Sequence, residues 1–149
     1  VKKILQPTKS LPDYNTVSDA DVVIMRYAHV LLMIAEAENE VNGPTEKALK
    51  AINAVRTRSH QPAIDGENLT QAELRERIRN EWRVETCFEG LRYFQLKRWK
   101  LLQQTVDGAV DPAYPAYTKV VTSAFEYFPL PQDEIDKAHG VLVQDPNYQ

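Results

Sequence analysis

Residues 80–99, with the sequence NEWRVETCFEGLRYFQLKRW, mix charged and aromatic side chains too closely for a simple surface helix. A surface helix separates its apolar residues and its charges onto opposite faces. Here several charges are expected to be partly buried and paired, because an unpaired buried charge is strongly destabilising. We therefore predict a structural charge network that also draws on the first helix. Its members are Arg26, Glu36, Glu81, Arg83, Glu85, Glu89, Arg92 and Arg98.

Apolar residues at helical spacing predict a chain that is mainly α. An apolar run begins at Val22, behind a capping box formed by Ser18 and Asp21. Asn42 and Gly43 end this helix, because they tolerate positive φ. Further helices are expected over 45–58, 70–89 and 91–102.

The first two helices predict a tetratricopeptide-like pair. Together they span about 37 residues, close to the period of about 34 in such repeats. One pair cannot bury its own faces, so we expect neighbours on both sides. The helices over 70–89 and 91–102 are candidates for a second pair.

The character of the chain changes after Gln104. Residues 105–149 are expected to form an irregular, partly β segment, with a short hairpin over 118–128 and a short helix over 132–138. Residues 1–17 are expected to be an extended lead-in, and 18–104 the helical pairs. This organisation predicts one domain. Because the sequence begins Val-Lys-Lys without Met, we expect that domain to be a piece of a longer protein.

Composition and spacing exclude several classes of function. The net charge of −3 argues against nucleic-acid binding, which needs a concentrated basic surface. His29 has no second His or Cys at metal-ligand spacing, so we predict no metal site and no cofactor. The single Cys87 lies among apolar residues at helical spacing and is predicted to be a core thiol.

Glu81, Glu85 and Glu89 recur every four residues and leave two interpretations open. Paired carboxylates about 5–9 Å apart serve glycosidases. The alternative is that they brace the helices by pairing with arginines, which lowers a carboxylate's pKa and makes it a poor general acid. We favour the second, non-enzymatic interpretation. The arginines considered as their partners are Arg77, Arg83, Arg92 and Arg98.

Aromatic residues supply the candidates for ligand contact. Trp82 and Trp99 fall on strongly periodic helices, which favours core packing over a sugar platform. Tyr114 and Tyr117 lie in a proline-containing stretch that we interpret as a loop. Because ligand contacts concentrate on loops held by a rigid scaffold, these tyrosines are the predicted ligand-binding residues. Arg26 could hold an anionic ligand, although internal pairing with Glu36 or Glu85 is the preferred interpretation.

Three blocks of sequence resemble one known family, in the family's own order. The first is RYAHVLLMIAEAENE over 26–40 with AINAVR over 51–56, the second runs from Ile78 to Trp99, and the third joins FPLPQDEID over 128–136 with QDPNY over 144–148. The chain therefore resembles the SusD/RagB family of outer-membrane nutrient-binding lipoproteins, specifically the C-terminal third. His29 and Gln95 depart from the residues usual in the family, Glu and Asp.

The resemblance implies a mostly helical, non-enzymatic protein with tetratricopeptide-like pairs. It also implies a lipid anchor, outside these residues, on the outer face of a Gram-negative outer membrane. There the protein would capture oligosaccharides, or less often peptides, for a SusC-like TonB-dependent transporter. The alternative function that we consider is a tetratricopeptide-like protein-protein interaction module.

Overall fold

The computed structural model describes residues 23–148, apart from the side chains at 115, 117 and 126. Two compact units divide the chain between Trp82 and Arg83. The predicted lead-in over 1–17 and the capping box at Ser18 lie outside the described residues. None of the helices within 23–148 combines the length and the apolar character needed to cross a membrane.

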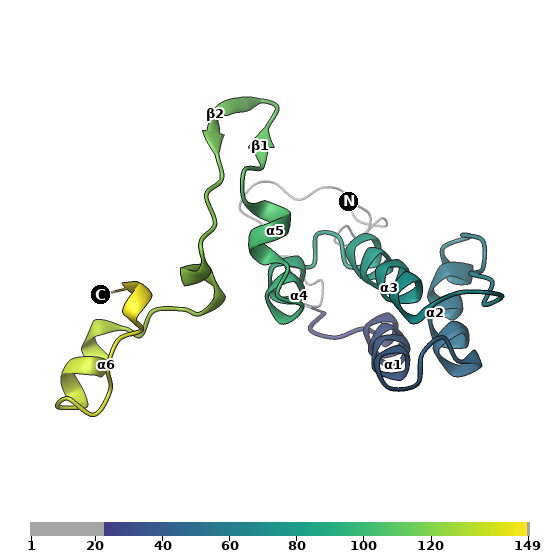
Figure 1. Ribbon diagram of the computed structural model, residues 1–149, viewed down its shortest axis with the longest axis horizontal. Helices are drawn as coiled ribbons and strands as arrows, with labels where there is room; N and C mark the ends of the chain where they lie inside the picture. The colour runs from purple at the N-terminus through teal and green to yellow at the C-terminus, as the bar shows by residue number, and fades with distance from the viewer. Residues whose placement is uncertain (1–22, 149) are drawn as a thin grey trace, which may run out of the picture. The chain divides into compact units, whose positions relative to one another are not determined.

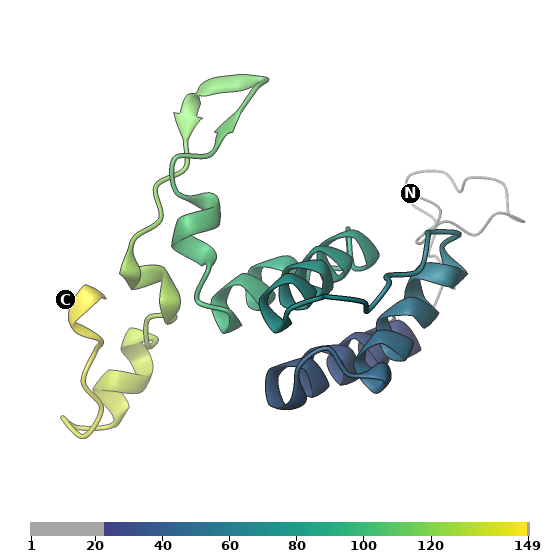
Figure 2. The same cartoon turned by 45° about the vertical axis from the view of Figure 1, so that its right-hand side comes forward.

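The first unit contains α1 (Tyr27–Asn42), α2 (Glu46–Arg58) and most of α3 (Gln71–Glu85). α1 and α2 lie side by side in both ribbon views, joined by a short connection (Figures 1 and 2). The predicted mainly helical chain with a tetratricopeptide-like pair is confirmed.

Local capping sets the ends of these helices as the sequence predicts. α1 ends at Asn42, and Gly43 follows with φ of 81°. The Thr45 hydroxyl accepts a hydrogen bond from Ala48 N at 3.3 Å and opens α2. At the start of α3, Thr70 N donates to the Glu73 carboxylate at 2.9 Å, while Glu73 N donates to Thr70 Oγ1 at 3.2 Å. Both orphan donors are satisfied reciprocally, as a capping box requires.

The core of the first unit lies where the three helices meet. Alanines at 35 and 48 are fully buried, which allows α1 and α2 to approach closely. The four-residue repeat predicted for α3 is confirmed by three buried side chains, Leu74, Ile78 and Trp82. The remaining large core side chains are Leu32, Ile52 and Val55.

Two helix boundaries differ from the predictions. Residues 23–26 are not helical, and Arg26 has an extended backbone with φ of −116°. Its N–H donates to Nδ1 of buried His29 at 3.3 Å. The side chain of His29 therefore provides an acceptor for a backbone N–H at the start of α1. α3 ends at Glu85 rather than Glu89, because the chain turns and Phe88 adopts φ of 65°. Cys87 lies in this turn and is exposed, so the predicted core thiol is wrong.

The predicted fourth helix over 91–102 is broken in two. α4 (Arg92–Arg98) and α5 (Leu102–Val106) are separated by Lys100, which has φ of 56°. The break brings Leu96 and Leu102 into one buried cluster with Val121. Partly buried side chains that pack against this cluster are Tyr93, Trp99, Leu101 and Val106.

The predicted hairpin over 118–128 is wrong in position. β1 (Val110–Asp111) and β2 (Tyr114–Thr118) form the antiparallel pair, which directly follows α5 in both ribbon views (Figures 1 and 2). The Asp111 carboxylate accepts a hydrogen bond from Ala113 N at 2.9 Å and closes the turn. Such Asx turns stabilise tight reversals, and Pro112 pre-sets φ within this one.

The C-terminal part of the second unit consists of short elements. They are η1 (Ser123–Glu126), α6 (Gln132–Lys137) and η2 (Pro146–Tyr148), and α6 confirms the predicted short helix. The Gln144 side chain donates to Leu130 O at 2.9 Å and accepts from Leu130 N at 3.0 Å. The Tyr148 hydroxyl lies 2.6 Å from Ala124 O and 2.8 Å from Tyr127 O. These hydrogen bonds hold the C-terminal residues against the segment that precedes α6.

Candidate functional site

A partly buried ion pair joins α2 to α3. Nη1 of Arg56 lies 2.6 Å from Oε2 of Glu81, whose residue is 5% exposed. Arg56 also donates from Nε to the carbonyl oxygen of Pro62 at 2.9 Å. The arginine that holds Glu81 therefore comes from the second helix. It was not among the partners considered from the sequence, and no local spacing signal points to it.

Other members of the predicted charge network differ in burial. Glu36 accepts a hydrogen bond from Nε1 of Trp82 at 3.1 Å, and Glu85 is 6% exposed. Glu89 is half-buried. Arg83 and Arg98 are exposed. Burial, followed by the positive charge of Arg83, lowers the pKa of the half-buried Arg92.

The glutamates at 81 and 85 are poorly placed for a reaction on a substrate. Both are buried, and an oxygen of Glu81 is already bound by the guanidinium of Arg56. A glycosidase needs two carboxylates that flank the scissile bond from an accessible cleft. The geometry therefore favours a bracing role for Glu81.

The two tryptophans differ in burial. Trp82 is 5% exposed, and its ring centroid lies 6.0 Å from that of His29. Trp99 is half-buried beside the cluster of Leu96 and Leu102. Among the described residues, no group of three or more His, Cys, Asp and Glu is placed to hold a metal ion.

The candidate ligand site lies on the hairpin. Tyr114 and Tyr117 belong to β2 rather than to an irregular loop, and Tyr114 is 63% exposed. An open hollow of about 550 Å³ is lined by Tyr114, Ala116 and Thr118, which alternate along one strand, together with Asp111 and Lys119. The hollow offers one aromatic ring, two hydroxyls and two charged groups. Polar groups around an apolar surface are the usual means of orienting a small ligand.

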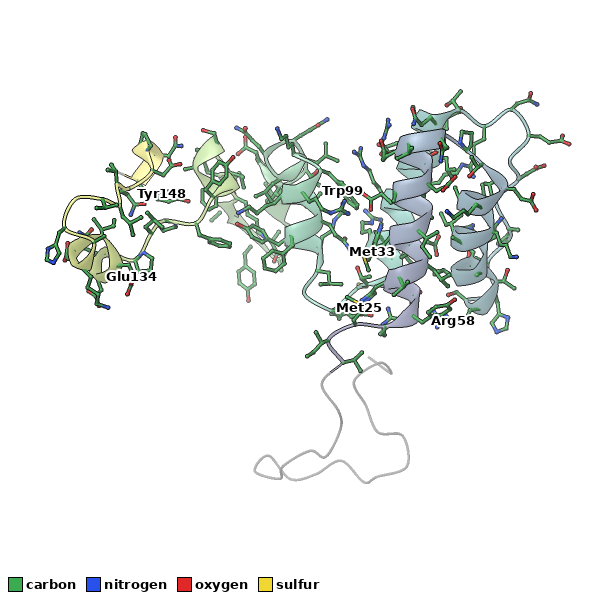
Figure 3. The ribbon with its side chains drawn as sticks, turned by 90° about the horizontal axis from the view of Figure 1, so that it is seen from below. Met25, Met33, Arg58, Trp99, Glu134 and Tyr148 are labelled. Atoms are coloured by element: carbon green, nitrogen blue, oxygen red, sulfur yellow. The ribbon has the colours of Figure 1, made fainter. Side chains whose placement is uncertain are left out.

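A second hollow, of about 210 Å³, lies between the start of α1 and the end of α2. Arg26 and Arg58 both line it, with Tyr27 and Leu31. Arg58 and the residue before Arg26, Met25, lie at the same end of the helix pair (Figure 3). Arg26 thus precedes the apolar helix instead of interrupting it.

An aromatic cluster in the second unit was not predicted. Nζ of Lys97 lies 4.2 Å from the ring centroid of Phe128 and 5.2 Å from that of Tyr93. Both distances suit a cation–π interaction. The rings come from segments more than thirty residues apart, so no local pattern could reveal the cluster.

The exposed pair of Glu40 and Arg75 makes stability depend on pH. Nε and Nη2 of Arg75 donate to the two carboxylate oxygens of Glu40 at 2.6 and 2.7 Å. The hydrogen bond from Arg75 is the main cause that lowers the pKa of Glu40, and partial burial opposes it. Hydrogen bonds from Thr70, first from its backbone N–H, likewise lower the pKa of Glu73.

We expect the free energy of unfolding to fall on acidification. A carboxyl whose pKa is lowered in the folded state stabilises the fold above its unfolded pKa of about 4.3, and this contribution is lost as pH falls through the folded pKa. Urea unfolding between about pH 6 and pH 3 measures the loss. It should be smaller in Arg75→Ala than in the wild type. An identical acid profile in both proteins would contradict this role of the pair.

Comparison with known proteins places these features in one family. The model of the SusD family matches residues 1–148. SusD-like protein P2 of Formosa agariphila is 31% identical over 137 residues, which cover 88% of this chain and 26% of that protein. SusD-like protein P25 of the same organism is 40% identical over 86 residues, which cover 56% of this chain and 16% of that protein.

Solved structures agree with this match. A SusD-like protein from Bacteroides fragilis superposes with a TM-score of 0.69 at 28% identity, covering 83% of this chain and 25% of that one. Surface glycan-binding protein A from Bacteroides thetaiotaomicron gives a TM-score of 0.63 at 30% identity, covering 83% and 24%. The chain thus spans about a quarter of the length of these relatives.

Proposed function

The chain belongs to the SusD family, and from this premise we propose that it is part of a cell-surface protein that binds glycans without cleaving them. The observation that carries the proposal is its likeness to a surface glycan-binding protein, with 30% identity over 83% of the chain. Burial of Glu81 and its bond to Arg56 support the non-enzymatic part of the proposal.

The proposed role is capture of oligosaccharides for a SusC-like TonB-dependent transporter. The full-length protein would be held by a lipid anchor on the extracellular face of the outer membrane. Membership of the SusD family supports both statements. Neither the transporter contact nor the anchor is assigned to a residue of this chain.

We further propose that Tyr114 contributes a glycan contact at the hairpin, while Tyr117, also in β2, stays a predicted ligand-binding residue. An exposed aromatic ring can stack on the apolar face of a pyranose, while the Thr118 hydroxyl and the charges of Asp111 and Lys119 suit sugar hydroxyls. The hollow is shallow and open, and one ring gives little pre-organised contact. Binding by this chain alone should therefore be weak, with a Kd of about 1 mM or higher.

Tyr114→Ala is expected to weaken oligosaccharide binding several-fold, because the ring is the main apolar surface of the hollow. NMR titration of the chain with a panel of neutral and acidic oligosaccharides measures the change. Tyr127→Ala is the matched control, since Tyr127 is also an exposed tyrosine of the second unit.

Two contrary outcomes have different meanings. Equal binding by wild type and Tyr114→Ala would remove the hairpin from the site while leaving glycan binding in place. Cleavage of any oligosaccharide, abolished in Glu85→Gln, would overturn the non-enzymatic assignment itself.

A further inference from the structure

The hollow at one end of the α1–α2 pair combines two arginines with apolar side chains. Arg26 lines it from the start of α1, and Arg58 lines it from the end of α2. Figure 3 shows Arg58 at the same end of the pair as Met25, the residue before Arg26. Buried Ala28 and Val55 supply apolar surface between these charges and the core. Two segments about thirty residues apart thus build one small site.

Local structure fixes the position of each arginine. Arg26 is half-buried in extended backbone, and its N–H is held by Nδ1 of His29 at 3.3 Å. Arg58 is the exposed last residue of α2, and its Nη2 lies 3.3 Å from Oγ of Ser59. A guanidinium has five N–H donors. Each arginine can therefore keep a partner within the protein and still donate to a ligand.

The charge of the hollow selects an anionic ligand. None of the described residues that line it is acidic, so both formal charges on its wall are positive. The planar fork of a guanidinium matches the two oxygens of a carboxylate, and such charge-assisted bonds are about twice as strong as neutral ones. A carboxylate is therefore the group that this wall recognises best.

The size and the apolar part of the hollow limit what carries that carboxylate. Its volume of about 210 Å³ is below the roughly 300–1,000 Å³ of pockets that hold drug-sized ligands, so one small ring fits. Leu31 is half-buried there, and the ring of Tyr27, in a residue that is 75% exposed, borders the opening. These side chains suit the apolar face of a ring, whereas a bare inorganic anion would gain nothing from them.

We propose that this hollow binds the carboxylate of an acidic sugar, a uronate residue of a glycan. The proposal rests on the proposed glycan-binding function for the choice of a sugar, and on Arg26 and Arg58 for the choice of a carboxylate. It adds a second sugar contact, in the first unit, to the one proposed for Tyr114 in the second. It also names a class of substrate, since a neutral glycan cannot use the two guanidinium groups.

A comparison of glucuronate with glucose tests the ligand class on the chain as it stands. The two sugars differ at a single carbon, which carries a carboxylate in one and a hydroxyl in the other. NMR titration should show glucuronate binding about tenfold more tightly, with shifts at the amide signals of Tyr27, Ala28 and Ala54. The preference should shrink as salt is added, because part of the attraction is between exposed charges.

Arginine variants locate the binding. Arg58→Gln should weaken glucuronate about tenfold and leave glucose unchanged, because Gln keeps donors but loses the charge. Arg58 is exposed, so circular dichroism should show unchanged helix content. Arg26→Gln should have the same effect on glucuronate. Arg77→Gln is the matched control, since Arg77 is also an exposed arginine of the first unit but does not line the hollow.

Two further probes test the source of the carboxylate. Inorganic sulfate supplies an oxyanion without a ring, and an N-acetylated dipeptide supplies a carboxylate on a peptide. Both should bind more weakly than glucuronate. Sulfate that binds as tightly would reduce the hollow to a general anion site, and a tighter dipeptide would assign it to peptide ends. Either result would overturn the proposal.

The same titrations separate this proposal from the proposed function. Equal binding of glucuronate and glucose, or equal loss in Arg58→Gln and Arg77→Gln, would overturn the acidic-sugar site. Oligosaccharide binding that depends on Tyr114 would still stand in that case. Glucuronate binding that Arg58→Gln weakens and Tyr114→Ala leaves unchanged supports the site.

Discussion

Arg56→Ala is expected to lower the free energy of unfolding of the first unit by about 3–5 kcal/mol. The substitution leaves the Glu81 carboxylate buried without the guanidinium that lies 2.6 Å from it. It also removes the bond that holds Pro62 O, at 2.9 Å. Urea unfolding followed by the fluorescence of Trp82 measures the loss, in a Trp99→Phe background so that only the first unit is observed.

A second pair of the same chemistry provides the control for Arg56. Arg75 and Glu40 also form an Arg–Glu pair, but their side chains are 29% and 43% exposed. Arg75→Ala should therefore lower the free energy of unfolding far less than Arg56→Ala does at neutral pH, because solvent screens an exposed pair. If both alanine variants show the same small decrease in the free energy of unfolding, Arg56 does not neutralise a buried carboxylate as the structure indicates.

The combination of Arg56→Ala with Glu81→Gln separates two contributions of Arg56. If most of the loss comes from an unpaired carboxylate, the second substitution should restore part of the stability, because Gln is uncharged. If most of it comes from the contact with Pro62, the two losses should add. Coupling between the substitutions is the expected result.

Trp82→Ala is expected to cost about 3–5 kcal/mol, since it removes the largest core side chain of α3 and leaves a cavity. The ring is 5% exposed and its Nε1 donates to Glu36 of α1. Circular dichroism during urea unfolding measures the change. Val84→Ala, at a neighbouring exposed position, should stay within about 0.5 kcal/mol.

Trp82→Phe tests whether the ring packs or binds sugar. It keeps most of the buried surface and loses the indole N–H, so it should cost about 1–2 kcal/mol, much less than alanine. Oligosaccharide binding should not change in either folded variant. A stable Trp82→Ala protein that has lost binding would make Trp82 a sugar platform instead of a core residue.

Features decided within a few residues were predicted well. Helix ends were marked by Asn42-Gly43, by Thr45 and by the Thr70–Glu73 capping box. Each cap satisfies the hydrogen bonds of backbone groups within one turn of it. The four-residue spacing of Leu74, Ile78 and Trp82 likewise indicates one buried face of a single helix. These interactions need no other segment of the chain.

Errors arose where two local patterns competed. β-branched and aromatic residues over 118–128 favoured a hairpin there, yet η1 forms at Ser123–Glu126. The hairpin forms instead around the Asp111 turn, where a side chain closes the reversal. Cys87 has the spacing of a core residue, but the helix that would have buried it ends two residues earlier.

By itself the sequence determined the helical class, the caps at Asn42-Gly43, Thr45 and Thr70, the apolar faces and the resemblance to the SusD family, because these depend on spacing along the chain. Only the tertiary structure decided which charges meet. Arg56 and Glu81 are 25 residues apart, and nothing in either segment specifies the other. The tertiary structure also showed that the outward face of α1 is apolar, while the outward faces of α2 and α3 are charged. The physical reason is that burial and pairing belong to contacts between segments, which form only when the helices pack together.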